Sequence, residues 1–142
     1  MDFEDNKKGF DYITAISSVE HIGLGAYGEE RRESALYEIT SKLSHLLKQG
    51  GKIIITVPFG RRYQDGFLRS FTHEEILSLF RSDNLKFITE RFYRRSDFKF
   101  YEPVKLEEAK EVSNSKMNRG PTGVNCVGCF VWEKVSGKGK EK

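Results

Sequence analysis

The sequence predicts an α/β fold in which a partial parallel sheet packs against helices. The segment KIIITVPFG (52–60) contains an unbroken apolar run, as in parallel strands that are covered on both faces. Predicted strands and helices also alternate along the chain, which favours parallel strands joined by crossover helices. We therefore expect an open three-layer sandwich with helices on both faces of a Rossmann-like sheet.

The first elements follow from hydrophobic periodicity. Residues 11–17 form a short β-rich run, and residues 33–48 place their apolar side chains on one stripe of an amphipathic helix. Gly50 and Gly51 are expected to end this helix, with Lys48 in its last turn.

The second half of the chain continues the alternation. Its expected elements are a strand over 52–57 ended by Pro58, a basic loop over 61–70, a helix opened by a capping box at 72–75, a strand over 85–93, a loop over 102–125 with a helical turn at 105–111, and a last strand over 126–133. We expect the last strand to pair antiparallel. Residues 1–135 are predicted to form a single domain, and residues 136–142 a disordered basic tail.

Composition excludes several classes of protein. The 11 Phe and 6 Tyr argue against a disordered chain, and a net charge of +3 is too small to indicate nucleic-acid binding. Two cysteines do not make a disulfide scaffold, and no apolar run approaches the roughly 20 residues of a membrane span. The N-terminus has no apolar signal-peptide core, so we expect a cytoplasmic protein.

Glu20 and His21 are the candidate catalytic residues. They follow the first predicted strand, and ligands of open α/β sheets bind at the carboxyl ends of strands. Histidine is the side chain best suited to proton transfer near neutral pH. A loop pair that serves only hydrogen bonding is an equally open interpretation.

Two further motifs have simpler structural interpretations. The stretch GLGAYG (23–28) matches a dinucleotide-binding fingerprint, but it begins six residues after the strand, and no acidic residue ends the next strand. We expect a loop whose glycines adopt unusual backbone angles. Cys126 and Cys129 lie three apart in a strand and so point to opposite faces, which predicts two core cysteines and no metal site.

The basic clusters are candidate substrate-binding residues. Arg61, Arg62 and Arg69 lie in the loop after the second strand and have aromatic neighbours. Arginines hold phosphate and other anionic groups through charge-assisted hydrogen bonds. A solvated basic surface is the simpler alternative.

The segments FDYITAISSVEHIGLGAYGE (10–29) and LLKQGGKIIITVPFG (46–60) resemble the middle of a class I S-adenosylmethionine-dependent methyltransferase. That family carries a Ser-x-Glu-His-type segment after its fourth strand and a Leu-Lys-Pro-Gly-Gly turn before its fifth, where this chain has Gln49 in place of Pro. The EHIGLGAYG stretch resembles that of an uncharacterised subgroup.

This resemblance implies strands equivalent to the family's fourth, fifth, sixth and seventh, without its cofactor-binding glycine motif. It implies S-adenosylmethionine as the cofactor, with Ser17 and Ser18 on the cofactor side of the site. Glu20, His21, Pro58 and Phe59 would lie on the substrate side. The binding site would be incomplete, as in a truncated or split enzyme.

Two functions follow as expectations. The first is methyl transfer to a small-molecule or glycan-type acceptor once the sheet is completed, with His21 as the base. The second is a non-catalytic α/β module for binding or oligomerisation. The bare edge of the first strand, a pairing hazard, would then be covered by a second copy or by a missing N-terminal half.

Overall fold

The computed structural model describes residues 9–25, 27–97, 100–120 and 123–137. In chain order the elements are β1 (Phe10–Ile16), the 3-10 helix η2 (Val19–His21), α1 (Ala35–Leu46), β2 (Leu47–Pro58), β3 (Tyr63–Gln64), β4 (Arg69–Ser70), α2 (His73–Leu79), β5 (Leu85–Arg95), β6 (Tyr101–Val104), α3 (Leu106–Ala109) and β7 (Cys126–Lys134). The predicted mixture of helices and strands is confirmed.

The main sheet has five strands in the order β1-β2-β7-β5-β6. β1 runs parallel to β2, whereas β7 runs antiparallel to both β2 and β5. The expected antiparallel pairing of the last strand is therefore confirmed. β1 lies at one edge of the sheet, and β3 and β4 form a separate hairpin.

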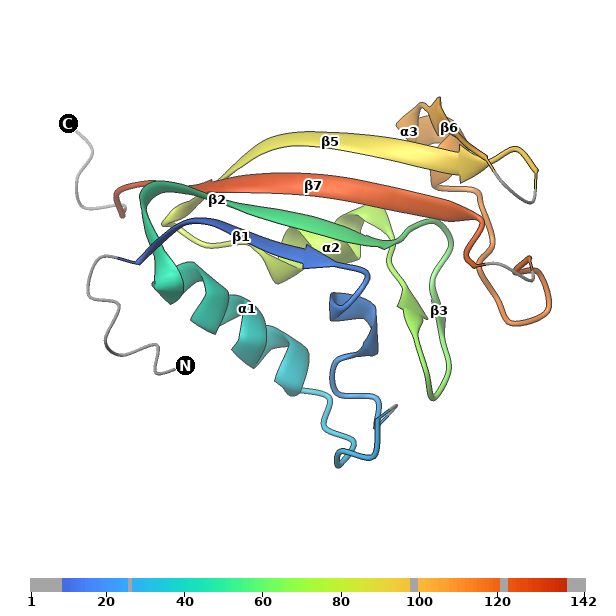
Figure 1. Ribbon diagram of the computed structural model, residues 1–142, viewed down its shortest axis with the longest axis horizontal. Coiled ribbons are helices and arrows are strands. Elements are labelled where there is room, and N and C mark those ends of the chain that lie inside the picture. The colour runs from blue at the N-terminus through green and yellow to red at the C-terminus, as the bar shows by residue number, and fades with distance from the viewer. Residues whose placement is uncertain (1–8, 26, 98–99, 121–122, 138–142) are drawn as a thin grey trace.

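The hydrophobic core lies on one face of this sheet (Figure 1). Alternate residues of β2 and β7 point into it, including Ile53 and Ile55 of β2 and Phe130 of β7, all with no exposed surface. Helices α1 and α2 lie on the same side of the sheet in Figure 1. Full burial of such side chains contributes about 1.5–3 kcal/mol each, so this face supplies most of the stability.

The opposite face corrects the prediction of a three-layer sandwich. Ile54 points away from the core and is half-buried, while Tyr12 and Ile16 of β1, on the same face, are 64% and 59% exposed. No helix covers this face in the part of the chain that the structure describes. The unbroken apolar run of β2 thus does not have helices on both sides.

Two local predictions also differ from the structure. Helix α1 ends at Leu46, and β2 begins at the next residue, so Lys48 lies in the strand rather than in the last helical turn. Gly50, with φ of +82°, lies within β2, where the pairing of β2 with β1 is irregular between Phe10 and Tyr12. The basic loop over 61–70 contains the β3–β4 hairpin.

The capping prediction is confirmed, whereas only one of the two cysteines predicted in the core lies there. The Thr72 hydroxyl accepts a hydrogen bond from the Glu75 backbone N–H at 3.2 Å and caps α2. Cys126 and Cys129 are both free; Cys126 is buried and Cys129 half-buried. Burial raises the pKa of the Cys126 thiol to about 11, so it stays protonated as expected of a core cysteine.

Within the described residues, no helix is both long and apolar enough to cross a membrane. The predicted basic tail begins at residue 136, and residues 138–142 of it lie outside the described part of the chain.

Candidate functional site

The candidate site begins where β1 ends. Ser17 follows the strand with φ of +49°, the left-handed region that few residues other than glycine adopt. Its backbone N–H donates to the carbonyl and the hydroxyl oxygen of Thr56 on β2, at 3.3 and 3.1 Å. This turn directs the chain away from the sheet into η2, which carries Glu20 and His21. Backbone strain of this kind is common at functional sites.

His21 is held by the tip of the β3–β4 hairpin. Its Nδ1 lies 2.5 Å from the carbonyl oxygen of Phe67, and a carbonyl can only accept, so Nδ1 carries the proton. The neutral ring then presents Nε2 as a lone-pair acceptor. The ring also contacts those of Phe67 and Tyr27, with centroids 4.5 and 5.6 Å away. Both aromatic side chains are largely exposed.

Glu20 lies beside this imidazole but is buried. Its Oε1 is 3.9 Å from Nε2 of His21, too far for a hydrogen bond. Its Oε2 is buried and has no hydrogen-bond partner among the described residues. Burial raises the pKa of Glu20, against the lowering effects of its own backbone hydrogen bond and of His21. A carboxyl group in this setting favours its neutral form.

A cleft of about 460 Å³ opens beside these residues. We call it the His21 cleft; it is bounded by His21, Ser18, Ile22, Tyr27 and Ala35, among others. This volume lies within the range of small-molecule sites. The structure thus brings two of the predicted site residues, Ser18 and His21, to one cavity.

The glycine-rich loop does not form a phosphate cradle. Gly23, Gly25 and Gly28 have φ of +77°, +77° and +88°, as expected for a loop with unusual backbone angles. The carboxylate of Glu29 accepts the backbone N–H groups of Gly25 and Tyr27 at 3.1 and 2.9 Å. Because an anion of the chain itself already occupies these amides, a nucleotide phosphate would have to displace it.

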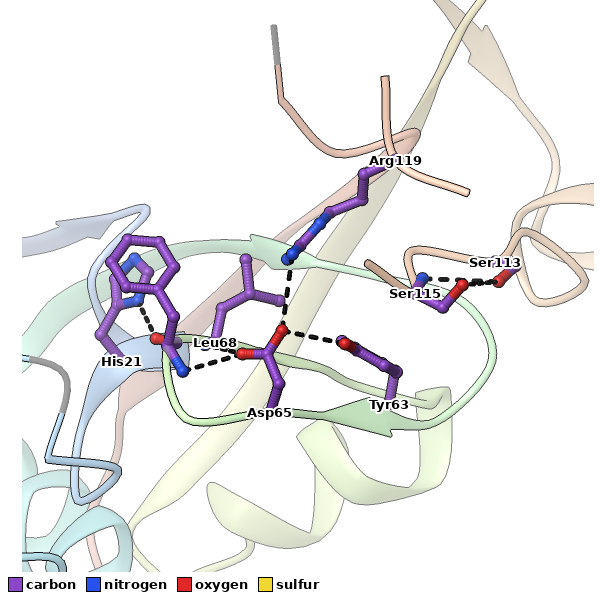
Figure 2. Close-up of polar contacts among 8 residues, drawn as sticks. His21, Tyr63, Asp65, Leu68, Ser113, Ser115 and Arg119 are labelled. Carbon is purple, nitrogen blue, oxygen red and sulfur yellow. Dashed lines mark hydrogen bonds and ion pairs between the residues drawn. The ribbon is translucent and has the colours of Figure 1, made fainter. Parts of the chain in front are cut away.

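Asp65 organises the hairpin that holds His21 (Figure 2). Its carboxylate accepts hydrogen bonds from the N–H groups of Phe67 and Leu68 at 2.8 and 2.9 Å and from the Tyr63 hydroxyl at 2.9 Å. The Arg119 guanidinium adds an ion pair at 3.4 Å. Burial opposes ionisation of Asp65, but these hydrogen bonds and the charge of Arg119 together lower its pKa.

A second cavity of about 550 Å³ shares Gly23 with the His21 cleft, and we call it the arginine cleft. The predicted residues Arg62 and Arg69 line it, together with Arg31 from the loop before α1. Arg61 does not line it; its guanidinium pairs with Glu111 at 3.1 Å. Of the three arginines predicted from the sequence to bind substrate, two therefore line this cleft and Arg61 lies outside it.

Pro58 is buried at the end of β2, and Phe59 lies in the core. The Phe59 ring is fully buried against Phe92 and Phe130, with centroids 4.6 and 5.9 Å away, and it lines neither cleft. Ser17 is exposed at the sheet edge.

The sequence interpretation missed Phe67, Tyr27, Asp65 and Arg31. One signal was available for the hairpin: Asp65-Gly66 is a common turn dipeptide between two strands. The contact between His21 and Phe67 joins residues 46 positions apart and has no counterpart in local sequence.

Comparison with known families gives one result. Residues 1–67, less than half of the chain, match the model of a family described as Caenorhabditis protein of unknown function, DUF268. No curated protein matches the chain.

This result corrects the family inferred from sequence. The identification with class I S-adenosylmethionine-dependent methyltransferases was wrong, because the matched family is DUF268, whose function is unknown, and nothing in the comparison supports a methyltransferase family. The matched residues include β1, η2, α1, β2 and the start of the hairpin, and so most of the His21 cleft.

Proposed function

We propose that the chain binds a small molecule in the His21 cleft and that Nε2 of His21 accepts a proton from a hydroxyl group of that molecule. The observation that carries this proposal is the hydrogen bond from Nδ1 of His21 to the Phe67 carbonyl. It fixes the tautomer and leaves Nε2 as the basic nitrogen. No hydrogen bond occupies Nε2 among the described residues.

The surroundings of His21 favour a phenol or another flat, partly apolar alcohol. Tyr27 and Phe67 place aromatic rings against the imidazole, at centroid distances of 5.6 and 4.5 Å. Aromatic rings pack well against each other in offset or edge-to-face geometry. When His21 gains the proton, the neighbouring Glu20 carboxyl gains a positive partner, which favours its ionised form.

S-adenosylmethionine as a ligand of this edge is a separate proposal, supported by the sequence segment that follows β1. Ser17 and Ser18 are the residues that would contact it. Two serine hydroxyls are too few contacts to hold both the adenosyl group and the amino-acid end of this molecule. We therefore propose weak binding, without methyl transfer. Calorimetric titration with S-adenosylmethionine tests this, and no heat of binding at millimolar ligand would contradict it.

A chromogenic nitrophenol tests the proton-acceptor proposal, because its anion absorbs visible light. At a pH below the phenol's own pKa, we expect added protein to convert bound phenol to phenolate. His21→Gln should abolish this conversion. His45→Gln is the matched control, because His45 lies on α1 with Nδ1 bonded to the Ser41 carbonyl, outside the cleft. Equal phenolate formation in wild type and His21→Gln would contradict the proposal.

A second candidate function is association of two copies through β1. The observation that favours it is the edge strand with its exposed Tyr12 and Ile16 on an uncovered face. Antiparallel pairing of two copies of β1 centred on Thr14 would set Tyr12 of each against Ile16 of the other. Aromatic pairs with β-branched residues and Thr–Thr pairs both stabilise neighbouring strands.

Sedimentation velocity tests the association. We expect wild type to sediment as a dimer and Ile16→Lys as a monomer, because the new charge would lie against Tyr12 of the other copy in place of the apolar Ile16 side chain. Phe87→Lys is the control: Phe87 is also exposed but lies on β5, away from β1 in the sheet order. A strictly monomeric, well-folded wild type would contradict this function.

A further inference from the structure

The arginine cleft is a second built cavity, separate from the His21 cleft. Its volume of about 550 Å³ is within the range of small-molecule sites. Arginines from two segments line it: Arg31 from the loop before α1, and Arg62 and Arg69 from around the hairpin. The sequence separates these segments, so their arginines meet only in the folded chain.

Arg69 is the unsatisfied group of this cleft. Its Nη1 is buried and has no hydrogen-bond partner among the described residues. Burial lowers the pKa of Arg69, and the positive charge of Arg31 lowers it further, against the opposite effects of Glu75 and Glu33. A buried guanidinium nitrogen without an acceptor is unfavourable, and a bound anion would satisfy it.

The charges around the cleft are unequally paired. Arg62 forms an ion pair with Glu75 at 3.4 Å. Neither Arg31 nor Arg69 forms an ion pair with a carboxylate of the described part of the chain. Arg31 and Arg69 are therefore the two guanidinium groups available to one anionic group between them. Guanidinium groups bind phosphate oxygens in bidentate geometry.

The rest of the lining suits hydroxyl groups. Glu33 and Glu74 line the same cavity, and carboxylates accept hydrogen bonds from hydroxyls. Tyr37 and Tyr63 add aromatic rings against which a ring-shaped ligand can pack. Glu75 also lines the cavity but pairs with Arg62, whereas Glu33 and Glu74 would repel a ligand that is anionic throughout. The ligand should therefore carry a single anionic group, held by the arginines.

We propose that the arginine cleft binds a phosphorylated polyhydroxyl compound of the sugar-phosphate class, with its phosphate between Arg31 and Arg69 and its hydroxyls toward Glu33 and Glu74. This goes beyond the function proposed for the His21 cleft, because it concerns another cavity, which has only Gly23 in common with that cleft. Its readout is binding and does not depend on proton transfer at His21.

Calorimetric titration with glucose 6-phosphate, inorganic phosphate and glucose tests the ligand class. We expect glucose 6-phosphate to bind at least tenfold more tightly than inorganic phosphate, and glucose to show no binding. Equal affinity for inorganic phosphate would overturn the polyhydroxyl part of the assignment. No binding of either phosphate compound would overturn the assignment as a whole.

Variants test the residues. Arg69→Gln and Arg31→Gln should each weaken glucose 6-phosphate binding at least tenfold. Arg31 is exposed, so its variant should fold even if the half-buried Arg69 is needed for stability. Arg61→Gln is the matched control, since Arg61 pairs with Glu111 and lies outside the cleft. Unchanged affinity in folded Arg31→Gln, or equal loss in Arg61→Gln, would overturn the assignment.

Discussion

The carbonyl oxygen of Phe67 accepts a hydrogen bond from Nδ1 of His21 at 2.5 Å, across 46 positions of sequence. The backbone N–H of Leu68, which belongs to the same peptide unit as this carbonyl, donates to the carboxylate of Asp65 at 2.9 Å. Asp65 thus holds in place the peptide whose carbonyl orients the imidazole, although Asp65 itself does not contact His21. The tautomer of His21 depends on this hairpin.

The first prediction concerns Asp65→Ala. The substitution removes the acceptor for two backbone N–H groups and the Tyr63 hydroxyl, and leaves Arg119 without its carboxylate. We expect the free energy of unfolding to fall by about 1–3 kcal/mol, measured by urea denaturation. Asp83→Ala, in an exposed turn, should change it by less than about 0.5 kcal/mol. Equal effects of the two substitutions would contradict the role of Asp65.

Asp65 also predicts a pH dependence. Its pKa is lower in the folded protein than its ordinary value of 3.8, so the folded state binds fewer protons than the unfolded chain as pH falls through this range. The stabilisation is therefore present above pH 3.8 and is lost as pH falls through the folded pKa. Wild type should lose more stability than Asp65→Ala when the denaturation is repeated at acidic pH.

Glu20→Gln is expected to stabilise the protein near neutral pH. Burial raises the pKa of Glu20 above its ordinary value of 4.5, so the folded state holds a proton that the unfolded chain releases. The contribution of Glu20 to stability is fully present below pH 4.5 and is lost as pH rises through the folded pKa. The neutral amide of Gln does not lose stability in this way, so we expect the free energy of unfolding near neutral pH to rise by about 1–3 kcal/mol. A variant less stable than wild type at pH 7 would show that the carboxylate has a partner in solution.

Asn114→Ala should be more damaging than most single substitutions. Asn114 is fully buried; its amide donates to the Phe59 carbonyl and the Ser70 hydroxyl, and its oxygen accepts the N–H groups of Asn125 and Cys126. The truncation leaves these buried groups unsatisfied, for a loss of about 3 kcal/mol or more in chemical denaturation. Asn118→Ala, by comparison, removes one exposed side-chain bond and should cost less than about 1 kcal/mol.

Gly23→Ala tests the loop between the two clefts. Gly23 has φ of +77°, and a Cβ there would lie 2.4 Å from the carbonyl oxygen of Arg32. Gly28→Ala meets the same type of backbone strain at φ of +88° but has no atom within 4 Å of the added carbon. We expect Gly28→Ala to cost about 1 kcal/mol and Gly23→Ala clearly more, by thermal denaturation. Similar losses would mean that the loop moves away from Arg32 without difficulty.

The strands of the sheet were predicted better from the sequence than the helical layers that cover it. The strands over 85–93 and 126–133 correspond to β5 and β7, and the antiparallel last strand was correct. The expected cover on both faces was wrong, because Ile54 has the same apolar character as Ile53 and Ile55 but lies on the open face. Residue type alone does not show whether a second layer exists.

The candidate site was predicted only in part. Local sequence placed Glu20 and His21 at the end of the first strand, and the structure places them there in η2. The partners that define their chemistry, Phe67 and Asp65, come from the hairpin and depend on tertiary packing. The family resemblance misled because it was assembled from short segments, each of which suits many α/β proteins.

Nitrogen-15 NMR of the three histidines is the most direct test of the central claim that Nε2 of His21 is the available base. Two-bond nitrogen–hydrogen correlations, recorded at a pH where the rings are neutral, distinguish the two tautomers of each imidazole. We predict that His21 carries its proton on Nδ1 and that Asp65→Ala allows the other tautomer to appear, whereas Asp83→Ala does not. A His21 ring protonated on Nε2 in the wild-type protein would contradict the proposed function.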